Sequence, residues 1–293
     1  MPGSDPLPSV GAVVLHMGDR PRELATALRD LLRQRGVRLD VVVVGNGWRP
    51  SGLPEGVRST YLPTNAGIPE GRNVGAREVH GDYLFFFDDD ATIPRDDVLA
   101  RLVEVVRTRP RAALCQPGLT DPETGAAPRR WVPRLRVRPG EDQGGQVASF
   151  SEGVVLVRRD AFREAGGWPG QFFFGHEGIE LAWQLVEHGW TLWYDPRIQV
   201  HHPYTEAARH DIYYRTNARN RVWVARRNLP APLVPVYLGT WTALTLARVR
   251  DKDALRVWFR GFAEGVREPA GPRRPISWRT VRELSRAGRP PVI

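Results

Sequence analysis

Short runs that are apolar at every position alternate along this chain with longer stretches in which apolar residues recur every three or four positions. Residues 10–15 and 41–44 are runs of the first kind, and residues 22–35 between them place four leucines along one helical stripe. Strands that are apolar throughout are typical of sheets buried on both faces. The pattern therefore predicts a βαβ opening to a doubly wound α/β fold with a Rossmann-like, mostly parallel sheet.

The same alternation continues to about residue 200. Strands are expected at residues 59–62, 83–87, 114–116, 152–158 and 191–194, and helices at 71–80, 96–107, from 160 onward and at 179–188. Residues 117–145 are rich in Pro, Gly and Arg and are expected to form an irregular excursion. Beyond residue 202 the pattern is helical. We therefore expect an α/β domain over residues 8–204, which would hold any ligand or catalytic site, and a basic helical C-terminal region over residues 205–293.

The composition favours a folded cytoplasmic protein. Hydrophobic residues make up 41% of the 293 positions, which is enough for one large core with an appended helical part. The single cysteine, Cys115, excludes an internal disulfide, favours a reducing compartment and is expected to be a buried apolar residue. The first residues contain neither the basic nor the apolar segment of an export signal.

Positive charge is concentrated towards the end of the chain. The net charge is +9, and beyond residue 204 there are 18 Arg and Lys against 7 Asp and Glu. This asymmetry favours an anionic partner such as a membrane surface or a lipid phosphate, although a general preference for Arg explains it equally well. A nucleic-acid binder is disfavoured, because the aromatic and basic residues do not interleave and one cysteine excludes a cysteine-based zinc site.

An apolar segment at residues 233–247 lies between arginines. It is shorter than the roughly 20 residues that a spanning helix needs. Its basic flanks and Trp241 suit an interfacial helix in peripheral contact with a membrane, and a core-packing helix is the alternative.

Three consecutive acids, Asp88, Asp89 and Asp90, end the apolar run at residues 83–87. Ligands of open α/β sheets bind beyond the carboxyl ends of the strands, which is where these side chains would emerge. Adjacent carboxylates repel one another, and a hard divalent cation such as Mn²⁺ or Mg²⁺, bridging the phosphates of a donor, would relieve that repulsion. A solvated acidic turn or a helix cap is the alternative interpretation.

Four segments in this order resemble family 2 of the inverting glycosyltransferases, over roughly residues 10–230. They are LPTNAGIPEGRNVG at residues 62–75, GDYLFFFDDDA at 81–91, FGHEGIELAWQL at 174–185 followed by Gly189-Trp190, and HHP at 201–203. The resemblance implies a GT-A fold. It also implies metal-dependent, inverting transfer of a sugar from a nucleotide diphosphate sugar to an acceptor hydroxyl, which a glycan or a lipid-linked molecule could provide.

The resemblance further implies a set of donor-binding residues. The residues expected to bind the nucleobase and ribose are His16, Asp19, Arg20 and Asn46. Those expected in the loop under the nucleotide are Asn65, Gly67, Arg72 and Asn73. The acid usually found before Asn46 is Gly45 in this chain, so base recognition departs from the family pattern. Asp88 is expected to contact the ribose or sugar and to take part in the metal site, and Asp89 to lie beside the donor.

The same resemblance places the metal on Asp90 and on one of two late histidines, His201 or His202, with His201 preferred. Imidazole together with carboxylate and phosphate oxygens suits Mn²⁺ or Mg²⁺. Arg219, in a basic segment with Arg215 and Arg221, would supply positive charge to the leaving diphosphate. A solvated or lipid-facing helix explains these arginines as well.

An inverting transfer needs a carboxylate that removes the proton of the acceptor hydroxyl. In the family this group is usually the second acid of a Glu-Asp pair, and here the pair is Glu177-Gly178. We therefore expect Glu177 to be the base and Glu180, one helical turn later, to contact the acceptor or position the helix. A carboxylate that caps the first helical turn is the alternative for Glu177.

Two other functions remain open at this point. A sugar nucleotidylyltransferase would carry a Gly-rich phosphate loop after the first strand, and residues 16–21 match one poorly. A degenerate module that binds a sugar nucleotide or glycan without turnover is compatible with Gly45 and Gly178.

Overall fold

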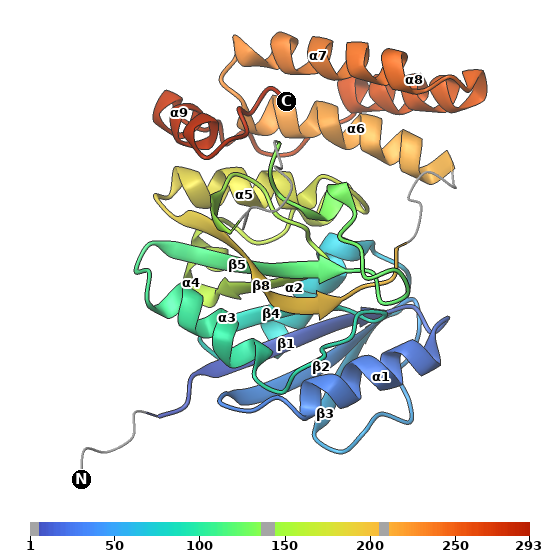
Figure 1. Cartoon of the computed structure of the whole chain (residues 1–293). Helices are drawn as coiled ribbons and strands as arrows, with labels where there is room; N and C mark the ends of the chain where they lie inside the picture. The colour runs from blue at the N-terminus through green and yellow to red at the C-terminus, as the bar shows by residue number, and fades with distance from the viewer. Residues whose placement is uncertain (1–5, 136–143, 205–210) are drawn as a thin grey trace.

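The computed structural model describes residues 6–135, 144–204 and 211–293. They form a sheet of eight strands in the order β3-β2-β1-β4-β7-β5-β8-β6, with helices on both faces (Figure 1). The strands are β1 (Ser9–His16), β2 (Arg38–Asn46), β3 (Val57–Leu62), β4 (Tyr83–Asp88), β5 (Ala112–Thr120), β6 (Gly145–Val147), β7 (Val154–Arg158) and β8 (Thr191–His201). β7 and β6 run against the common direction of the other strands. The expected doubly wound, mostly parallel sheet is thereby confirmed.

Two cores lie on the two faces of the sheet, because the inward residues of each strand alternate between them. One face is covered by α1 (Pro21–Leu32) and α3 (Val98–Arg107), and the other by α2 (Ile68–Glu78), α4 (Arg159–Glu164) and α5 (Glu177–Glu187). Short 3₁₀ turns stand at η1 (Arg129–Trp131) and η2 (Gly170–Phe172). Cys115 is fully buried on β5, as expected, and burial raises the pKa of its thiol.

The C-terminal helices stack on the α5 side of the sheet (Figure 1). They are α6 (Asp211–Asn228), α7 (Leu233–Arg248), α8 (Lys252–Arg267) and α9 (Trp278–Arg286). α6 and α8 approach so closely that an added Cβ at Gly261 would lie 2.1 Å from the carbonyl oxygen of Arg215. This close approach requires glycine at position 261.

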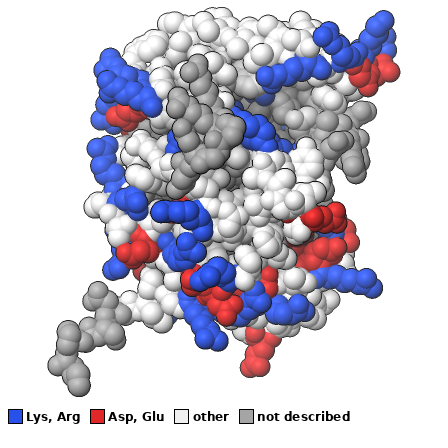
Figure 2. Space-filling view, in the orientation of Figure 1, with Lys and Arg blue, Asp and Glu red and all other residues white. Residues whose placement is uncertain are grey.

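α7 lies on the surface of the molecule. Of its residues, all of which the structure describes, only Tyr237 is buried, while Val236 is 50% exposed. Figure 2 shows Arg and Lys side chains at both ends of the upper edge, over the C-terminal helices, with a broad uncharged surface between them. Among the described residues, no helix combines the length and apolar character needed to cross a bilayer.

The excursion predicted for residues 117–145 is only partly irregular, which corrects the prediction. β5 continues to Thr120 because Gly118 and Leu119 still pair with β8 beyond an irregularity at Pro117. β6 then adds a short antiparallel strand at the edge of the sheet. Residues 136–143 of this stretch lie outside the described residues.

A second correction concerns the strand expected at residues 152–158. β7 begins only at Val154, and residues 152 and 153 form a turn. Because β7 runs antiparallel to β4, this turn lies beside the carboxyl end of β4. Glu152 therefore reaches the edge of the sheet at which the three aspartates emerge.

Candidate active site

A cleft of about 490 Å³ opens at the carboxyl ends of β1, β2 and β4. This is the edge at which open α/β sheets bind their ligands. Its lining brings together most of the predicted site residues, namely His16, Arg20, Asn46, Asn65, Gly67, Asp88, Asp89, Asp90 and His202. Phe173 and Phe174, which the sequence did not single out, form part of the opposite wall.

The three aspartates diverge towards different partners. Arg72 donates from Nη2 to Asp88 Oδ1 at 2.7 Å, and Arg20 pairs with both Asp89 and Asp90. Nδ1 of the buried His16 lies 2.5 Å from Asp89 Oδ2. Asp89 is thus paired with side chains from β1 and the turn that follows it, whereas Asp88 Oδ2 and Asp90 Oδ1 lie beside His202.

Asp88, Asp90 and His202 form a cluster in which one ligand atom of each residue lies within 4.8 Å of the others. His202 Nε2 is 3.3 Å from Asp88 Oδ2 and 3.4 Å from Asp90 Oδ1. Two carboxylate oxygens and one imidazole nitrogen facing a cleft are a donor set that suits Mn²⁺ or Mg²⁺. In a second cluster of this kind, His16, Asp19 and Asp89, the Asp89 carboxylate is paired with both His16 Nδ1 and Arg20.

Electrostatics in this cluster reflect the concentration of acids. Burial raises the pKa of Asp90, and the neighbouring Asp88 adds to that rise. Burial would also raise the pKa of Asp88, but Arg72 and His202 outweigh it and hold the pKa below its ordinary value. Burial would lower the pKa of His202, but Asp88 and Asp90 outweigh this effect and raise the pKa to about 9. The proton on His202 here offsets the negative charge of the two carboxylates, and a bound cation would offset that charge instead.

The preference for His201 is corrected by this geometry. His201 ends β8, where its backbone pairs with Thr92, and it does not belong to either cluster found among the described residues. Successive side chains of an extended strand point to opposite sides, so only one of two adjacent histidines can face the aspartates. That histidine is His202.

Asn46 and Asn65 organise the turn under the cleft. Asn46 Nδ2 donates to Asn65 Oδ1 at 2.9 Å, and Asn46 Oδ1 accepts from the Ala66 N–H at 2.8 Å. Gly67 has a φ of 87°, and an added Cβ there would lie 2.5 Å from the Cα of Phe173. The glycine is needed because the loop before α5 packs directly on this turn.

At position 45 the structure explains the missing acid. A Cβ at Gly45 would lie 1.9 Å from the carbonyl oxygen of Trp48, so no side chain fits. The Trp48 ring instead packs edge-on against His16, with the ring centroids 5.1 Å apart. Asp19 lies nearby on the exposed turn and is not part of the cleft lining described above.

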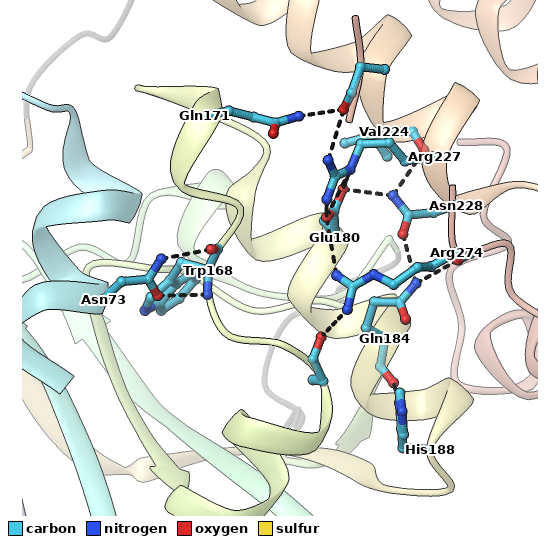
Figure 3. A network of polar contacts seen from close by, with 12 residues as sticks. Asn73, Trp168, Gln171, Glu180, Gln184, His188, Val224, Arg227, Asn228 and Arg274 are labelled. Atoms are coloured by element: carbon cyan, nitrogen blue, oxygen red, sulfur yellow. Dashed lines mark hydrogen bonds and ion pairs between the residues drawn. The ribbon is translucent and has the colours of Figure 1, made fainter. Parts of the chain in front are cut away.

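Two residues predicted to contact the nucleotide, Asn73 and Arg219, form hydrogen bonds with loop backbone instead. Asn73 binds the backbone of Trp168, donating to its carbonyl at 2.9 Å and accepting from its N–H at 3.0 Å (Figure 3). Arg219 donates to the Phe172 carbonyl at 2.9 Å and lies over the Trp223 ring. Neither side chain is part of the cleft lining, and both hold the loop before α5.

Glu180 is likewise not an acceptor contact. It is 1% exposed and is paired with Arg227, whose Nη2 lies 2.5 Å from Oε1 and whose Nε donates to Oε2 at 2.8 Å. Asn228 donates to Oε2 at 2.7 Å (Figure 3). This network joins α5 to α6, so Glu180 positions the helix and does not reach the cleft.

The loop that leads into α5 is held in an unusual conformation. Phe173 and His176 have φ values of 64° and 70°, a region that non-glycine residues rarely adopt. Asn220 Nδ2 lies within 2.9 Å of the carbonyl oxygens of Phe172, Phe174 and Gly175 and donates to them. The fixed loop places Glu177 at the first position of α5, close to the cleft wall formed by Phe173 and Phe174.

Glu177 is only 4% exposed, and its Oε2 has no hydrogen-bond partner among the described residues. Burial, and secondly the carboxyl group of Glu152, raise its pKa to about 7. Burial raises the pKa of Glu152 as well, and Glu152 Oε1 accepts from the Gly178 N–H at 3.0 Å. Glu152 was missed from the sequence, where it looks like the first residue of a strand. The only hint was the absence of an acid at position 178.

The raised pKa of Glu177 makes a prediction about stability. Below pH 4.5 its carboxyl is protonated in both the folded and the unfolded chain, whereas between pH 4.5 and about 7 ionisation favours the unfolded chain. We expect the free energy of unfolding of the wild type, relative to Glu177→Gln, to fall by roughly 2–3 kcal/mol from pH 4.5 to pH 8. Urea unfolding of both proteins at the two pH values measures this difference. If the free energies of unfolding of the two proteins change equally with pH, the Glu177 carboxyl is not desolvated in the folded chain.

Comparison with known sequences agrees with the motifs. A sequence model of glycosyl transferase family 2 matches residues 13–166. The chain is 28% identical over 239 residues to the succinoglycan biosynthesis protein ExoM of Rhizobium meliloti, covering 71% of this chain and 68% of that protein. It is 27% identical over 222 residues to the pre-mycofactocin glycosyltransferase of Mycobacterium tuberculosis, covering 70% of this chain and only 43% of the relative.

Solved structures with little sequence identity share the fold. GalNAc-T7, solved with UDP, GalNAc and Mn²⁺, superposes with a TM-score of 0.64 at 15% identity, over 91% of this chain and 57% of that one. The mannosyltransferase PcManGT from Pyrobaculum calidifontis, solved with GDP-Man and Mn²⁺, gives 0.56 at 17% identity, over 96% and 84%. TarS 1–349 of S. aureus with UDP gives 0.62 at 12% identity, over 89% and 82%.

The matched residues contain the end of β1, the turn under the cleft, and the three aspartates. The relatives in sequence include a named glycosyltransferase, and the structural neighbours are GT-A enzymes. Because the family model covers more than half of the chain, the chain belongs to glycosyl transferase family 2, and it is a glycosyltransferase with the GT-A fold.

Proposed function

We propose that this glycosyltransferase inverts configuration at the anomeric carbon, takes its sugar from a nucleoside diphosphate sugar and depends on a divalent metal ion. The observation that carries the proposal is the convergence of Asp88, Asp90 and His202 at the cleft beyond β4. When bound there, Mn²⁺ or Mg²⁺ would neutralise the diphosphate of the donor as it leaves.

The residues around this cluster have complementary roles in the proposal. His16, Arg20, Asn46 and Asn65 line the part of the cleft next to β1 and β2, where the nucleoside would bind. Arg72 holds Asp88 and adds positive charge beneath the sugar side of the cleft. A carboxylate near the start of α5 would accept the proton of the acceptor hydroxyl as this hydroxyl attacks the anomeric carbon.

The experiment that tests this proposal measures the thermal midpoint of the purified protein with UDP, GDP and dTDP, with and without Mn²⁺. A ligand that binds only the folded state stabilises it, by about 2.7 kcal/mol at 100 times its Kd. We expect one diphosphate to raise the midpoint only when Mn²⁺ is present, and the matching monophosphate to raise it less. If no diphosphate has an effect, the donor assignment is wrong; binding without nucleotide release would favour a module that lacks turnover.

We also propose that residues 8–204 carry the catalytic site and that residues 205–293 bring it to a lipid-linked or glycan acceptor at a membrane. The exposed apolar residues of α7, together with the Arg and Lys side chains at both ends of the upper edge of the molecule, support this role (Figure 2). The protein should sediment with phosphatidylglycerol vesicles at low salt, but not with phosphatidylcholine vesicles. If the protein sediments with neither kind of vesicle, the membrane no longer belongs in the proposal.

A further inference from the structure

Glu152 fills the space beside Gly178, where the second acid of the family's Glu-Asp pair would stand. Its Oε1 accepts a hydrogen bond from the Gly178 N–H at 3.0 Å. A Cβ added at Gly178 would lie 2.4 Å from that same oxygen and 2.5 Å from Cγ of Glu152. A side chain at position 178 and the observed position of Glu152 therefore exclude each other. Position 178 carries no carboxylate, and Glu152 places one in the space beside it.

The turn that carries Glu152 packs against Asp88, one of the residues that line the cleft. The neighbouring Gly153 accepts from the Asp88 N–H at 2.9 Å through its carbonyl. A Cβ at Gly153 would lie 2.3 Å from Asp88 Oδ2 and 3.6 Å from His202 Nε2. The turn at residues 152 and 153 is thus packed between the predicted metal cluster and the start of α5.

Accessibility separates Glu152 from Glu177. Glu177 is 4% exposed, whereas Glu152 is partly exposed. A base must come within hydrogen-bond distance of the hydroxyl that it deprotonates, so it has to be reachable by the acceptor. Of these two carboxylates, Glu152 meets that requirement better.

We propose that Glu152 is the catalytic base of this enzyme, supplied by the turn before β7 in place of an acid at position 178. The inference rests on the proposed inverting transfer. In the step, the acceptor oxygen forms a bond to the anomeric carbon while the bond from that carbon to the diphosphate oxygen breaks, and its electron pair leaves with the diphosphate. The proton of the acceptor hydroxyl passes to a carboxylate oxygen of Glu152 and is later released to solvent. Glu177 remains as a buried neighbour that shapes the first turn of α5.

The test measures release of nucleoside diphosphate from the sugar nucleotide whose diphosphate gives the largest thermal shift, with a panel of alkyl glycosides as acceptors. Glu152→Gln should lower kcat about 10²–10⁴-fold, the usual contribution of a general base, and leave the nucleotide-induced thermal shift unchanged. Glu104→Gln, an exposed glutamate on α3, is the matched control and should behave as the wild type.

Moving the carboxylate provides the sharper experiment. Gly178→Asp alone should be inactive and less stable, because the new side chain collides with Glu152. Glu152→Gly alone should be inactive and folded. The double variant Glu152→Gly/Gly178→Asp should regain activity, to at least about tenfold above either single variant, because it restores one carboxylate in the same space. The same four proteins should show non-additive thermal midpoints, since the collision exists only when both side chains are present.

The outcomes separate this inference from the function on which it rests. If the wild type releases no nucleotide, the proposed transfer is wrong and the inference falls with it. If the wild type turns over and Glu152→Gln keeps its kcat while Glu177→Gln loses it, the base is Glu177 and the inference alone is overturned. If both glutamine variants are inactive, the double variant decides: recovered activity supports Glu152, and no recovery overturns it.

Discussion

Replacing Asp90 by alanine is expected to abolish the Mn²⁺-dependent part of donor binding and to lower kcat/KM on the order of 10³-fold. Asp90 offers Oδ1 to the cluster at 3.4 Å from His202 Nε2, and Asp88 is the only other carboxylate of that cluster. Its loss would leave two protein ligands for an ion that must also hold the donor diphosphate. The thermal midpoint with nucleoside diphosphate, titrated with Mn²⁺, and the rate of nucleotide release are the two measurements.

Asp97→Asn is the matched control for this prediction. Asp97 lies on the same connection between β4 and α3, but its side chain is 43% exposed and pairs with Arg95. Its removal should leave both measurements unchanged. A pair of histidine variants adds a second check, since His202→Asn should weaken the response to Mn²⁺ and His201→Asn should not. Retention of the full response in Asp90→Ala would show that the metal binds elsewhere.

Removing the charge of Glu180 is expected to lower the free energy of unfolding by about 3–5 kcal/mol. In Glu180→Gln the buried guanidinium of Arg227 keeps only neutral partners, and an uncompensated charge in the interior is costly. Folded domains are stable by only about 5–15 kcal/mol, so the loss would be a large fraction of the total. Urea unfolding, followed by circular dichroism, measures the change.

The double variant Glu180→Gln/Arg227→Gln shows whether the pair is responsible. Because Gln at both positions removes the buried charge of Arg227 together with that of Glu180, and Arg274, the other partner of Glu180, is 38% exposed, the cost should be smaller than the sum of the single costs. Asp253→Asn breaks an exposed pair, with Arg256, of similar length at 2.6 Å, and should change stability little. Additive costs, or a change of less than about 1 kcal/mol in Glu180→Gln, would mean that the network in Figure 3 contributes little to holding α6 on α5.

The candidate site shows which predictions depend on neighbours in the chain and which on neighbours in space. Asp88 and Asp90 were predicted correctly as cleft residues, because a buried parallel strand delivers whatever follows it to one edge of the sheet. The choice between His201 and His202 required the direction of a side chain at the end of β8, which depends on how that strand pairs. Asn73 and Arg219 carry suitable chemistry, yet their hydrogen bonds go to loop backbone that no local pattern reveals.

Periodicity and local chemistry alone predict the doubly wound sheet, the two layers of helices and the acidic edge. The reason is that the spacing of the apolar residues in a strand or helix indicates which of its faces is buried. The roles of the glutamates were decided only by tertiary structure. Glu180 and Glu177 are one turn apart on α5, but α6 supplies Arg227 to the first, and the turn before β7 brings Glu152 beside the second. The protonation state and the function of a carboxylate depend on the charges and solvent around it. Here those surroundings come from distant parts of the chain: Arg227 is 47 residues from Glu180, and Glu152 is 26 residues from Gly178.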